Sequence, residues 1–236
     1  FILRRRFKIL KLTVRKGDWT NFYSFMLWII LAIPLVISQE YLISASGKLK
    51  ELNSIKDINK SRIEKYYTLK NHFIDKTALG IHTDITVTGK RNTNYNMHWY
   101  IAVPIFESPE DTVLRQVRPL AWVGIQYNKT IRNNLSQTEK NRTYQEFATE
   151  SQASFALEDF TDFSYLARMK YADVEDNFSL AVGKNPYYYP SDLLFTMVHQ
   201  PFEMRNGNKL NWIAGMIIFG SFVWFIMLSI PEINRR

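Results

Sequence analysis

The sequence predicts an α+β membrane protein in which two transmembrane helices flank one mixed extracytoplasmic domain. Two uncharged and mainly apolar runs carry this prediction, namely residues 19–39, which number 21, and residues 212–230, which number 19. At ~1.5 Å per residue, each run is about as long as the ~30 Å hydrocarbon core of a bilayer is thick. The 172 residues between them, 40–211, are enough for one domain with its own core, and both of its ends must lie on the same side of the membrane.

The net charge of +8 is concentrated near the chain ends. Residues 1–18 carry a charge of +6, whereas residues 40–211 carry +1 and residues 231–236 carry another +1. Because basic residues close to a span are retained in the cytoplasm, we expect both termini to be cytoplasmic and the domain to be extracytoplasmic. The expected place is the periplasmic side of a bacterial inner membrane, with the topologically equivalent space of an organelle as the alternative. The nearly neutral domain gives no electrostatic indication of nucleic-acid binding, so nucleic acid is not an expected partner.

Residues 1–18 form the predicted basic juxtamembrane segment, in which apolar and basic residues are mixed. Such a segment can bury its apolar side in the membrane interface while its charges meet anionic lipid; docking onto an acidic cytoplasmic partner is the alternative. The first span is longer than the apolar region of a signal peptide and lacks a small-residue cleavage site, so we expect an uncleaved anchor. The residues expected at the lipid interface are Arg4, Arg5, Arg6, Lys8, Lys11, Trp19 and Trp212.

The first part of the domain is predicted to change from helix to strands. Residues 41–69 contain helix-favouring residues with apolar positions spaced mostly by three, which predicts a helix leaving the membrane with a break near 57–61. Beyond it, apolar and polar residues alternate, and we expect one buried strand face made of Ile81, Thr83, Ile85 and Val87. Residues 89–94 have the composition of a hairpin turn. The predicted strands are 72–88, 97–105, 120–127 and 163–169.

Two helices are predicted after the first three strands. Ser136 and Glu139 form a capping box, and the apolar residues Tyr144, Phe147, Phe155 and Leu157 then recur at approximately helical spacing. Residues 172–182 predict a short helix ended by a glycine. Strands first and helices afterwards are typical of an α+β domain.

Residues 185–202 are rich in tyrosine and proline and lie close to the second span. We expect a return loop in the headgroup zone, where amphipathic rings are favoured; the functional interpretation is a contact surface for another membrane subunit. The second span also carries small residues among bulky ones, which would let another helix approach closely, unless the two spans pack against each other there. The candidate partner-interface residues are Tyr187, Tyr188, Tyr189, Met197, Phe202, Ala214, Gly215 and Ser221.

The chain offers little catalytic chemistry. It contains no cysteine, which excludes disulfides and thiolate sites, and it has no zinc-protease, nucleophile-elbow or phosphate-loop motif. His82, Asp84 and His98 could meet across the hairpin and hold a metal ion, but solvent-exposed polar residues are the better interpretation. We therefore predict no cofactor, no metal site and no identified small-molecule substrate. Five glycosylation sequons are attributed to chance, with glycan acceptors as the alternative: Asn59, Asn128, Asn134, Asn141 and Asn177.

Three functions are compatible with these features. The first is a non-catalytic accessory or structural subunit of a membrane protein complex, whose partners are other integral membrane subunits and the lipid bilayer. The second is the extracytoplasmic ligand-sensing domain of a transmembrane receptor, which should contain a concave pocket with convergent polar groups. The third is a membrane-tethered enzyme, which the missing motifs support least. The accessory subunit is the predicted function.

Overall fold

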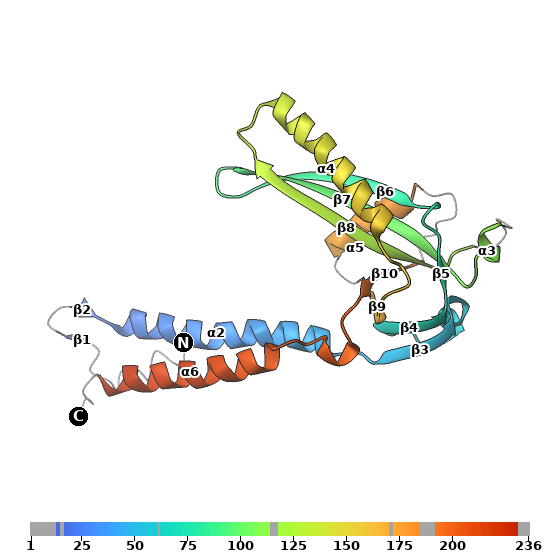
Figure 1. Ribbon diagram of the computed structural model, residues 1–236. Helices are drawn as coiled ribbons and strands as arrows, with labels where there is room; N and C mark the ends of the chain where they lie inside the picture. Colours follow the sequence, from blue (N-terminus) through green and yellow to red (C-terminus); the bar gives the residue numbers. More distant parts are fainter. Residues whose placement is uncertain are drawn as a thin grey trace. The chain divides into compact units, whose positions relative to one another are not determined.

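The computed structural model describes residues 13–14, 17–60, 62–113, 118–169, 172–184 and 192–230. It is a mixed α+β structure whose described part holds five α-helices, two 3-10 helices and one eight-stranded sheet, besides a small two-stranded ladder (Figure 1). The ladder pairs β1 (Thr13–Val14) with β2 (Gly17–Asp18). The chain divides into two compact units, one made of Phe1–Ser46 with Glu203–Arg236 and the other of Gly47–Phe202.

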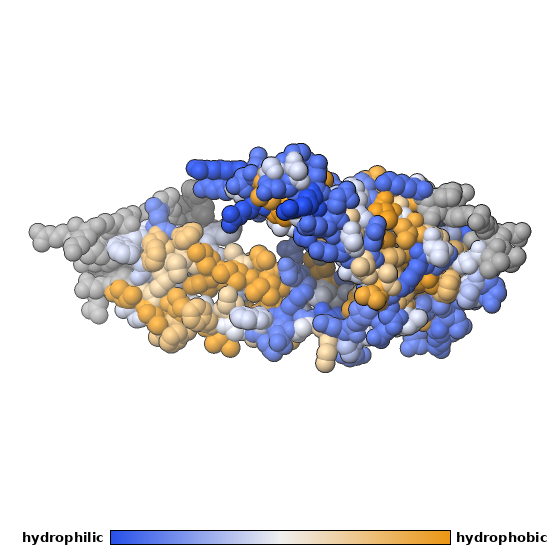
Figure 2. Space-filling model, turned by 45° about the horizontal axis from the view of Figure 1, so that its top comes forward, coloured by the Kyte–Doolittle hydropathy of each residue, from blue (hydrophilic) through white to orange (hydrophobic). Residues whose placement is uncertain are grey.

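The first unit contains two long helices, α2 (Thr20–Ala45) and α6 (Lys209–Ser229). Both are long and apolar enough to cross a membrane, as the sequence predicts. With 26 and 21 residues they extend for roughly 39 and 32 Å, because each residue adds about 1.5 Å. Figure 2 shows hydrophobic residues over most of the visible face of this unit.

The predicted helix over residues 41–69 is wrong beyond Ala45. A strand, a 3-10 helix and a second strand follow instead: β3 (Leu49–Ser54), η2 (Ile55–Lys60) and β4 (Tyr66–Asn71). Gly47, with φ +107°, follows the helix end in a backbone conformation that favours glycine. Three of the apolar residues that suggested a helical face, Leu52, Ile55 and Ile58, are buried in the main core instead, whereas Ile63 is exposed. Leu52 reaches this core from β3, in which it is the parallel partner of Leu69 in β4.

The sheet runs in the order β3-β4-β9-β10-β8-β7-β5, and β6 pairs with β7 beside β5. The predicted hairpin is confirmed, with β6 (Gly80–Thr88) antiparallel to β7 (Asn94–Phe106). The remaining strands are β5 (Phe73–Ile74), β8 (Ala121–Arg132), β9 (Tyr165–Arg168) and β10 (Leu193–Val198). β6, β7 and the outer half of β8 therefore form a long three-stranded ribbon (Figure 1).

Helices pack on both faces of this sheet. α4 (Gln137–Leu157) begins with the predicted capping box, and its buried Phe147 packs edge to face on Trp99 of β7. On the opposite face, α5 (Ala172–Val182) packs Phe178 edge to face on Tyr100. Trp99 and Tyr100 are neighbours in one strand and so point to opposite faces, which gives the sheet two separate cores. The short helices are α3 (Glu110–Val113) and η3 (Phe202–Met204).

Three further expectations need correction. Ile85 and Val87, expected on a buried strand face, are 46% and 45% exposed because β6 lies at an edge of the sheet while α4 packs over its neighbour β7. Leu157, the last residue of α4, is exposed. Residues 185–202 contain strand β10, which pairs in parallel with β8 some 70 positions earlier in the chain. A pairing partner so distant in the chain cannot be recognised from the residues around β10.

Candidate interaction site

The two long helices approach each other closely at Gly220 of α6. A Cβ atom at this position would lie 2.7 Å from Cγ2 of Ile30 in α2, so only glycine allows the observed contact. Pro34, which is buried in α2, has no N–H to donate to the carbonyl of Ile30 one turn earlier. The contact between α2 and α6 therefore coincides with the point where the backbone of α2 lacks one helical hydrogen bond.

At one end of the helix pair, a tyrosine of α2 binds the end of α6. The hydroxyl of Tyr23 donates to the backbone carbonyl of Met227 at 2.8 Å, and both residues are buried. The ring of Tyr23 also packs edge to face on Trp224. Met227 lies in the last turn of α6, where carbonyl groups have no donor within the helix, so Tyr23 supplies a missing partner.

At the other end, two basic residues bind the end of α2. The guanidinium of Arg205 donates to the carbonyls of Ser44 and Ala45 at 3.3 and 3.4 Å, and the amine of Lys209 donates to Oγ of Ser44 at 3.4 Å. The C-terminus of a helix carries partial negative charge, which positive side chains stabilise. The C-terminus of each long helix is thus capped by residues from another part of the chain: Tyr23 caps α6, and Arg205 and Lys209 cap α2.

The predicted small-residue seam of α6 faces away from this contact. The residues of α6 that pack against α2 include Gly220, Val223, Trp224 and Met227. Ala214, Gly215 and Ser221 are exposed, and a Cβ added at Gly215 would meet no atom within 4 Å. The two helices do pack against each other, but not through the residues that the sequence singled out. Gly220, which the sequence analysis missed, is recognisable as a glycine in the middle of an apolar span.

The other candidate interface residues are distributed over the chain. Met197 lies in β10, partly buried against the main core, and Phe202 packs edge to face on the rings of Tyr66 and Tyr165. Trp19 and Trp212 are exposed at the starts of α2 and α6. The remaining candidates lie outside the described residues: Arg4, Arg5, Arg6, Lys8, Lys11, Tyr187, Tyr188 and Tyr189.

The hairpin brings His82, Asp84 and His98 to one face of the sheet, with Asp84 directly opposite His98. Both ring nitrogens of His98 are engaged, Nδ1 with Oδ1 of Asn128 at 2.7 Å and Nε2 with Oγ1 of Thr86 at 3.2 Å. Within the described ranges, no group of three or more His, Cys, Asp or Glu residues is arranged to hold a metal ion. This face is instead a network of polar side chains between strands.

Tyr100 lies between the two imidazole rings of that face, with ring centroids 6.2 Å from His82 and 6.1 Å from His98. Burial raises the pKa of its hydroxyl above the ordinary value, and the negative charge of Asp84 acts in the same direction. The hydroxyl therefore stays protonated at neutral pH and acts as a neutral hydrogen-bonding group rather than as a base.

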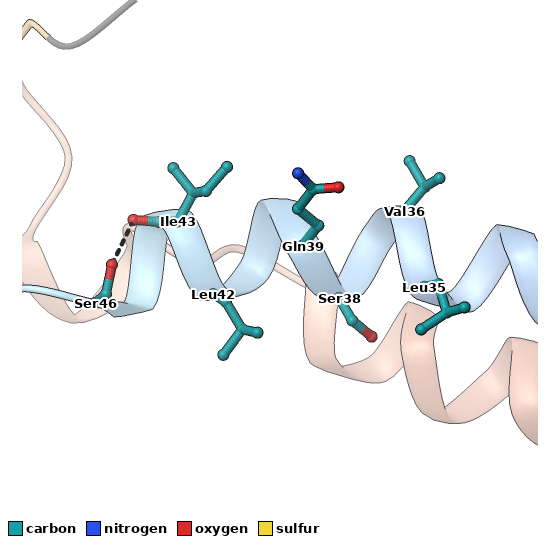
Figure 3. Close-up of a pocket in the computed structure, with 7 residues that line it drawn as sticks. All are labelled: Leu35, Val36, Ser38, Gln39, Leu42, Ile43 and Ser46. Atoms are coloured by element: carbon teal, nitrogen blue, oxygen red, sulfur yellow. Dashed lines mark hydrogen bonds between the residues drawn. The ribbon is translucent and has the colours of Figure 1, made fainter.

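A hollow on the surface of α2 is lined by residues of that helix and the residue that follows it (Figure 3). Most of its side chains are aliphatic, and its terminal Ser46 donates through Oγ to the carbonyl of Ile43 at 3.1 Å. A second hollow lies on the outer surface of α4, between charged side chains such as Arg142 and Glu150. Both are open surfaces of a single helix, unlike the concave pockets that enclose small ligands. The first is lined by Leu35, Val36, Ser38, Gln39, Leu42, Ile43 and Ser46.

Comparisons with protein-family models, with curated proteins and with solved structures find no match. The candidate site therefore rests on the geometry of α2 and α6 alone. The site has two parts. In the first, α2 and α6 supply hydrogen-bond partners for each other's ends; the second is a set of small residues that are exposed on the side of α6 away from α2.

Proposed function

We propose that this protein is a non-catalytic accessory or structural subunit of a membrane protein complex, to which it contributes two membrane spans and an extracytoplasmic interaction domain. One observation carries the proposal. α2 and α6 use Gly220, Tyr23 and Met227 for their mutual contact, while Ala214, Gly215 and Ser221 stay exposed. Because small side chains allow close approach of another helix, this exposed face suits a helix of a neighbouring subunit.

The proposed topology has both termini in the cytoplasm and residues 40–211 outside it. The basic residues that precede the first span and the two arginines that end the chain support this orientation. The outer side also has basic residues close to the spans, but Arg205 and Lys209 bind the C-terminal end of α2. The helix terminus partly balances their charges, so we expect Arg205 and Lys209 to oppose the proposed orientation less than other basic residues would.

The mass of the native particle tests the proposal. After purification from its own membrane in a mild detergent, the protein should be found in a particle heavier than one 27.9 kDa chain with its bound detergent and lipid. Ser221→Leu, alone or with Ala214→Leu, should release the chain from this particle because a bulky side chain blocks helix approach. The matched control is Phe219→Leu, which changes another exposed position of α6 and should leave the particle intact.

Two results would contradict the proposal. One is that the protein purified from its own membrane is a single chain that is folded and stable without any partner. The other is an assembly that survives Ser221→Leu with Ala214→Leu but dissociates on Phe219→Leu. A lone chain whose thermal stability rises with a small soluble ligand would favour the receptor hypothesis instead.

A further inference from the structure

The outer edge of β6 has no strand paired with it among the described residues. Among the residues that the structure describes, β6 pairs with β7 only. The amine of Lys184 donates to the carbonyl of Ile81 at 3.0 Å near the start of the strand. Further along, Ile85 and Val87 are half exposed, although both point to the face that α4 covers at β7. The stretch from Thr83 to Thr88 is therefore an extended edge with two aliphatic side chains available for contact.

The end of the same ribbon carries three exposed basic residues. Lys90 and Arg91 in the turn and Arg132 at the end of β8 are exposed, and none has an ion-pair partner in the described part of the chain. The nearest acidic residue in sequence to Arg132, Glu139, is bound to Ser136 in the capping box of α4. The tip therefore has a net positive charge that the described residues do not balance.

The basic tip is held in place by hydrogen bonds between its two loops. The backbone N–H of Asn133 donates to the carbonyl of Thr93 at 2.8 Å, and its side-chain amide donates to the carbonyl of Asn92 at 2.9 Å. The amine of Lys140 donates to Oδ1 of Asn133 at 2.7 Å. These bonds join the β6–β7 turn to the start of α4, so the cations are displayed on an ordered loop rather than on a free one.

We propose that the edge of β6 binds an extended, acidic segment of a partner subunit, which adds a strand to the sheet and places its carboxylates beside Lys90, Arg91 and Arg132. An added strand would form backbone hydrogen bonds along 83–88 and cover Ile85 and Val87 with cross-strand neighbours. The cations of the tip, which no described residue pairs, select an acidic segment over a basic or neutral one. This inference rests on the proposed function, because it requires a partner subunit.

A second copy of the chain is a poorer occupant. Asp84 is the only acidic residue of β6, and the charged residues of the turn that follows are all basic. Pairing two copies would therefore supply few carboxylates to the two basic tips. Natural proteins usually protect a free edge with charges, bulges or covering segments, and a long edge with exposed aliphatic residues is an open template for pairing.

Synthetic peptides test the inference with the full chain in detergent. The probe is a fluorescent peptide of alternating valine and threonine that ends in a run of aspartates. One control peptide has lysines in place of the aspartates, and another has a proline in the middle of the alternating part. Fluorescence anisotropy gives the affinity, and amide hydrogen exchange reports on residues 83–88. We expect the aspartate peptide to bind and to slow exchange there, whereas both control peptides bind at least about tenfold more weakly, a difference of about 1.4 kcal/mol.

Matched variants separate the two parts of the surface. Lys90→Glu with Arg132→Glu reverses the charge of the tip, and its control is Lys70→Glu, an exposed lysine of β4. Ile85→Asn removes an aliphatic contact of the edge without changing its charge, and its control is Ile63→Asn, since Ile63 is 44% exposed and Ile85 is 46% exposed. Both test variants should lower the affinity for the aspartate peptide by at least about tenfold, and both controls should leave this affinity unchanged.

Several outcomes would overturn the inference. Equal affinity for the aspartate and lysine peptides, or no binding of either, would exclude an acidic strand. Full affinity of the proline peptide, with sensitivity to the tip variant alone, would point to a simple anionic contact such as lipid headgroups. A native particle with two copies that Ile85→Asn separates would make a second copy the occupant. None of these results depends on the α6 variants, so the proposed function can survive failure of this inference.

Discussion

The hydroxyl of Tyr23 donates a hydrogen bond of 2.8 Å to the backbone carbonyl of Met227, a residue 204 positions later in the chain. This bond joins the start of one apolar helix to the end of the other. In an apolar medium an unsatisfied carbonyl is costly, so a side-chain donor at a helix end has more effect there than on a solvated surface. The two helices are therefore held together by specific polar contacts at their ends and by close packing at Gly220.

Tyr23→Phe should weaken the helix pair because it removes the donor and leaves the carbonyl of Met227 unpaired. The expected loss is about 1 kcal/mol of unfolding free energy, or somewhat more if the end of α6 stays dry. Thermal unfolding of the purified chain in detergent measures it. Tyr41→Phe, near the other end of α2, is the control and should have no comparable effect; equal losses in both variants would contradict the role given to this bond.

The two glycines of α6 should respond to alanine in opposite directions. Gly215→Ala adds a methyl group in open space and replaces a poor helix former, so it should stabilise the isolated chain by up to about 1 kcal/mol. Gly220→Ala forces a methyl group against Ile30 and should destabilise the chain by about 1–3 kcal/mol. Both values follow from thermal unfolding in detergent. A gain in both variants would mean that α2 and α6 are not in close contact at Gly220.

Arg91→Gly should stabilise the outer domain. Arg91 has φ +67° at the third position of the turn closed by the hydrogen bond from Asn92 N–H to the carbonyl of Gly89, where glycine is favoured. A side chain in this left-handed region costs about 1 kcal/mol, which glycine recovers in part. Thermal unfolding should therefore show a small gain for Arg91→Gly and none for Lys90→Gly. A loss of stability in Arg91→Gly would show that the arginine side chain itself stabilises the turn.

The ion pair between η2 and the end of β7 predicts a pH dependence of stability. Nζ of Lys56 lies 2.6 Å from Oε2 of Glu107 and 3.5 Å from Oδ2 of Asp111. Hydrogen bonds from Lys56 and then Ser54 hold the pKa of Glu107 below its ordinary value, and the hydrogen bond to Glu107 raises the pKa of Lys56.

The sign of the pH effect follows from these shifts. The contribution of Glu107 is present above its ordinary pKa and is lost as the pH falls through its lowered pKa in the folded protein. The contribution of Lys56 is present below its ordinary pKa and is lost as the pH rises through its raised pKa. The difference in thermal stability between the wild-type protein and Glu107→Gln should therefore be constant between these limits and shrink on both sides. A difference that grows with acid would contradict this pairing.

Cysteine labelling tests the orientation, since the chain contains no cysteine of its own. A cysteine introduced at Asn92, in the exposed β6–β7 turn, should react with a membrane-impermeant reagent on spheroplasts. A cysteine introduced at Thr13 should react only after the membrane is permeabilised. The reverse pattern would invert the proposed topology, and labelling at both positions would exclude a membrane barrier between them.

The sequence alone determined the features that depend on neighbouring residues. The absence of charge identified both apolar helices, because the length and hydropathy of a span are local properties. The capping box at Ser136 and Glu139 and the turn over residues 89–94 were also predicted correctly, since a few adjacent side chains decide them. The short helix that ends at Val182 was recognised from the glycine that follows it.

Only the tertiary structure decided the features that depend on distant partners. Residues 49–54 and 66–71 are strands because they pair with each other and β4 then pairs with β9, which no helical spacing of leucine and isoleucine can reveal. β10 exists as a strand between β8 and β9, and Val87 is exposed because α4 packs over β7 and not over β6. Likewise, α6 contacts α2 through Gly220 and not through Ala214 or Ser221. The rotational orientation of α6 about its own axis decides this, and only the tertiary structure shows that orientation. A helix has many apolar faces of similar composition, and only the side chains of its neighbour, here Ile30 and Tyr23, determine which one is buried.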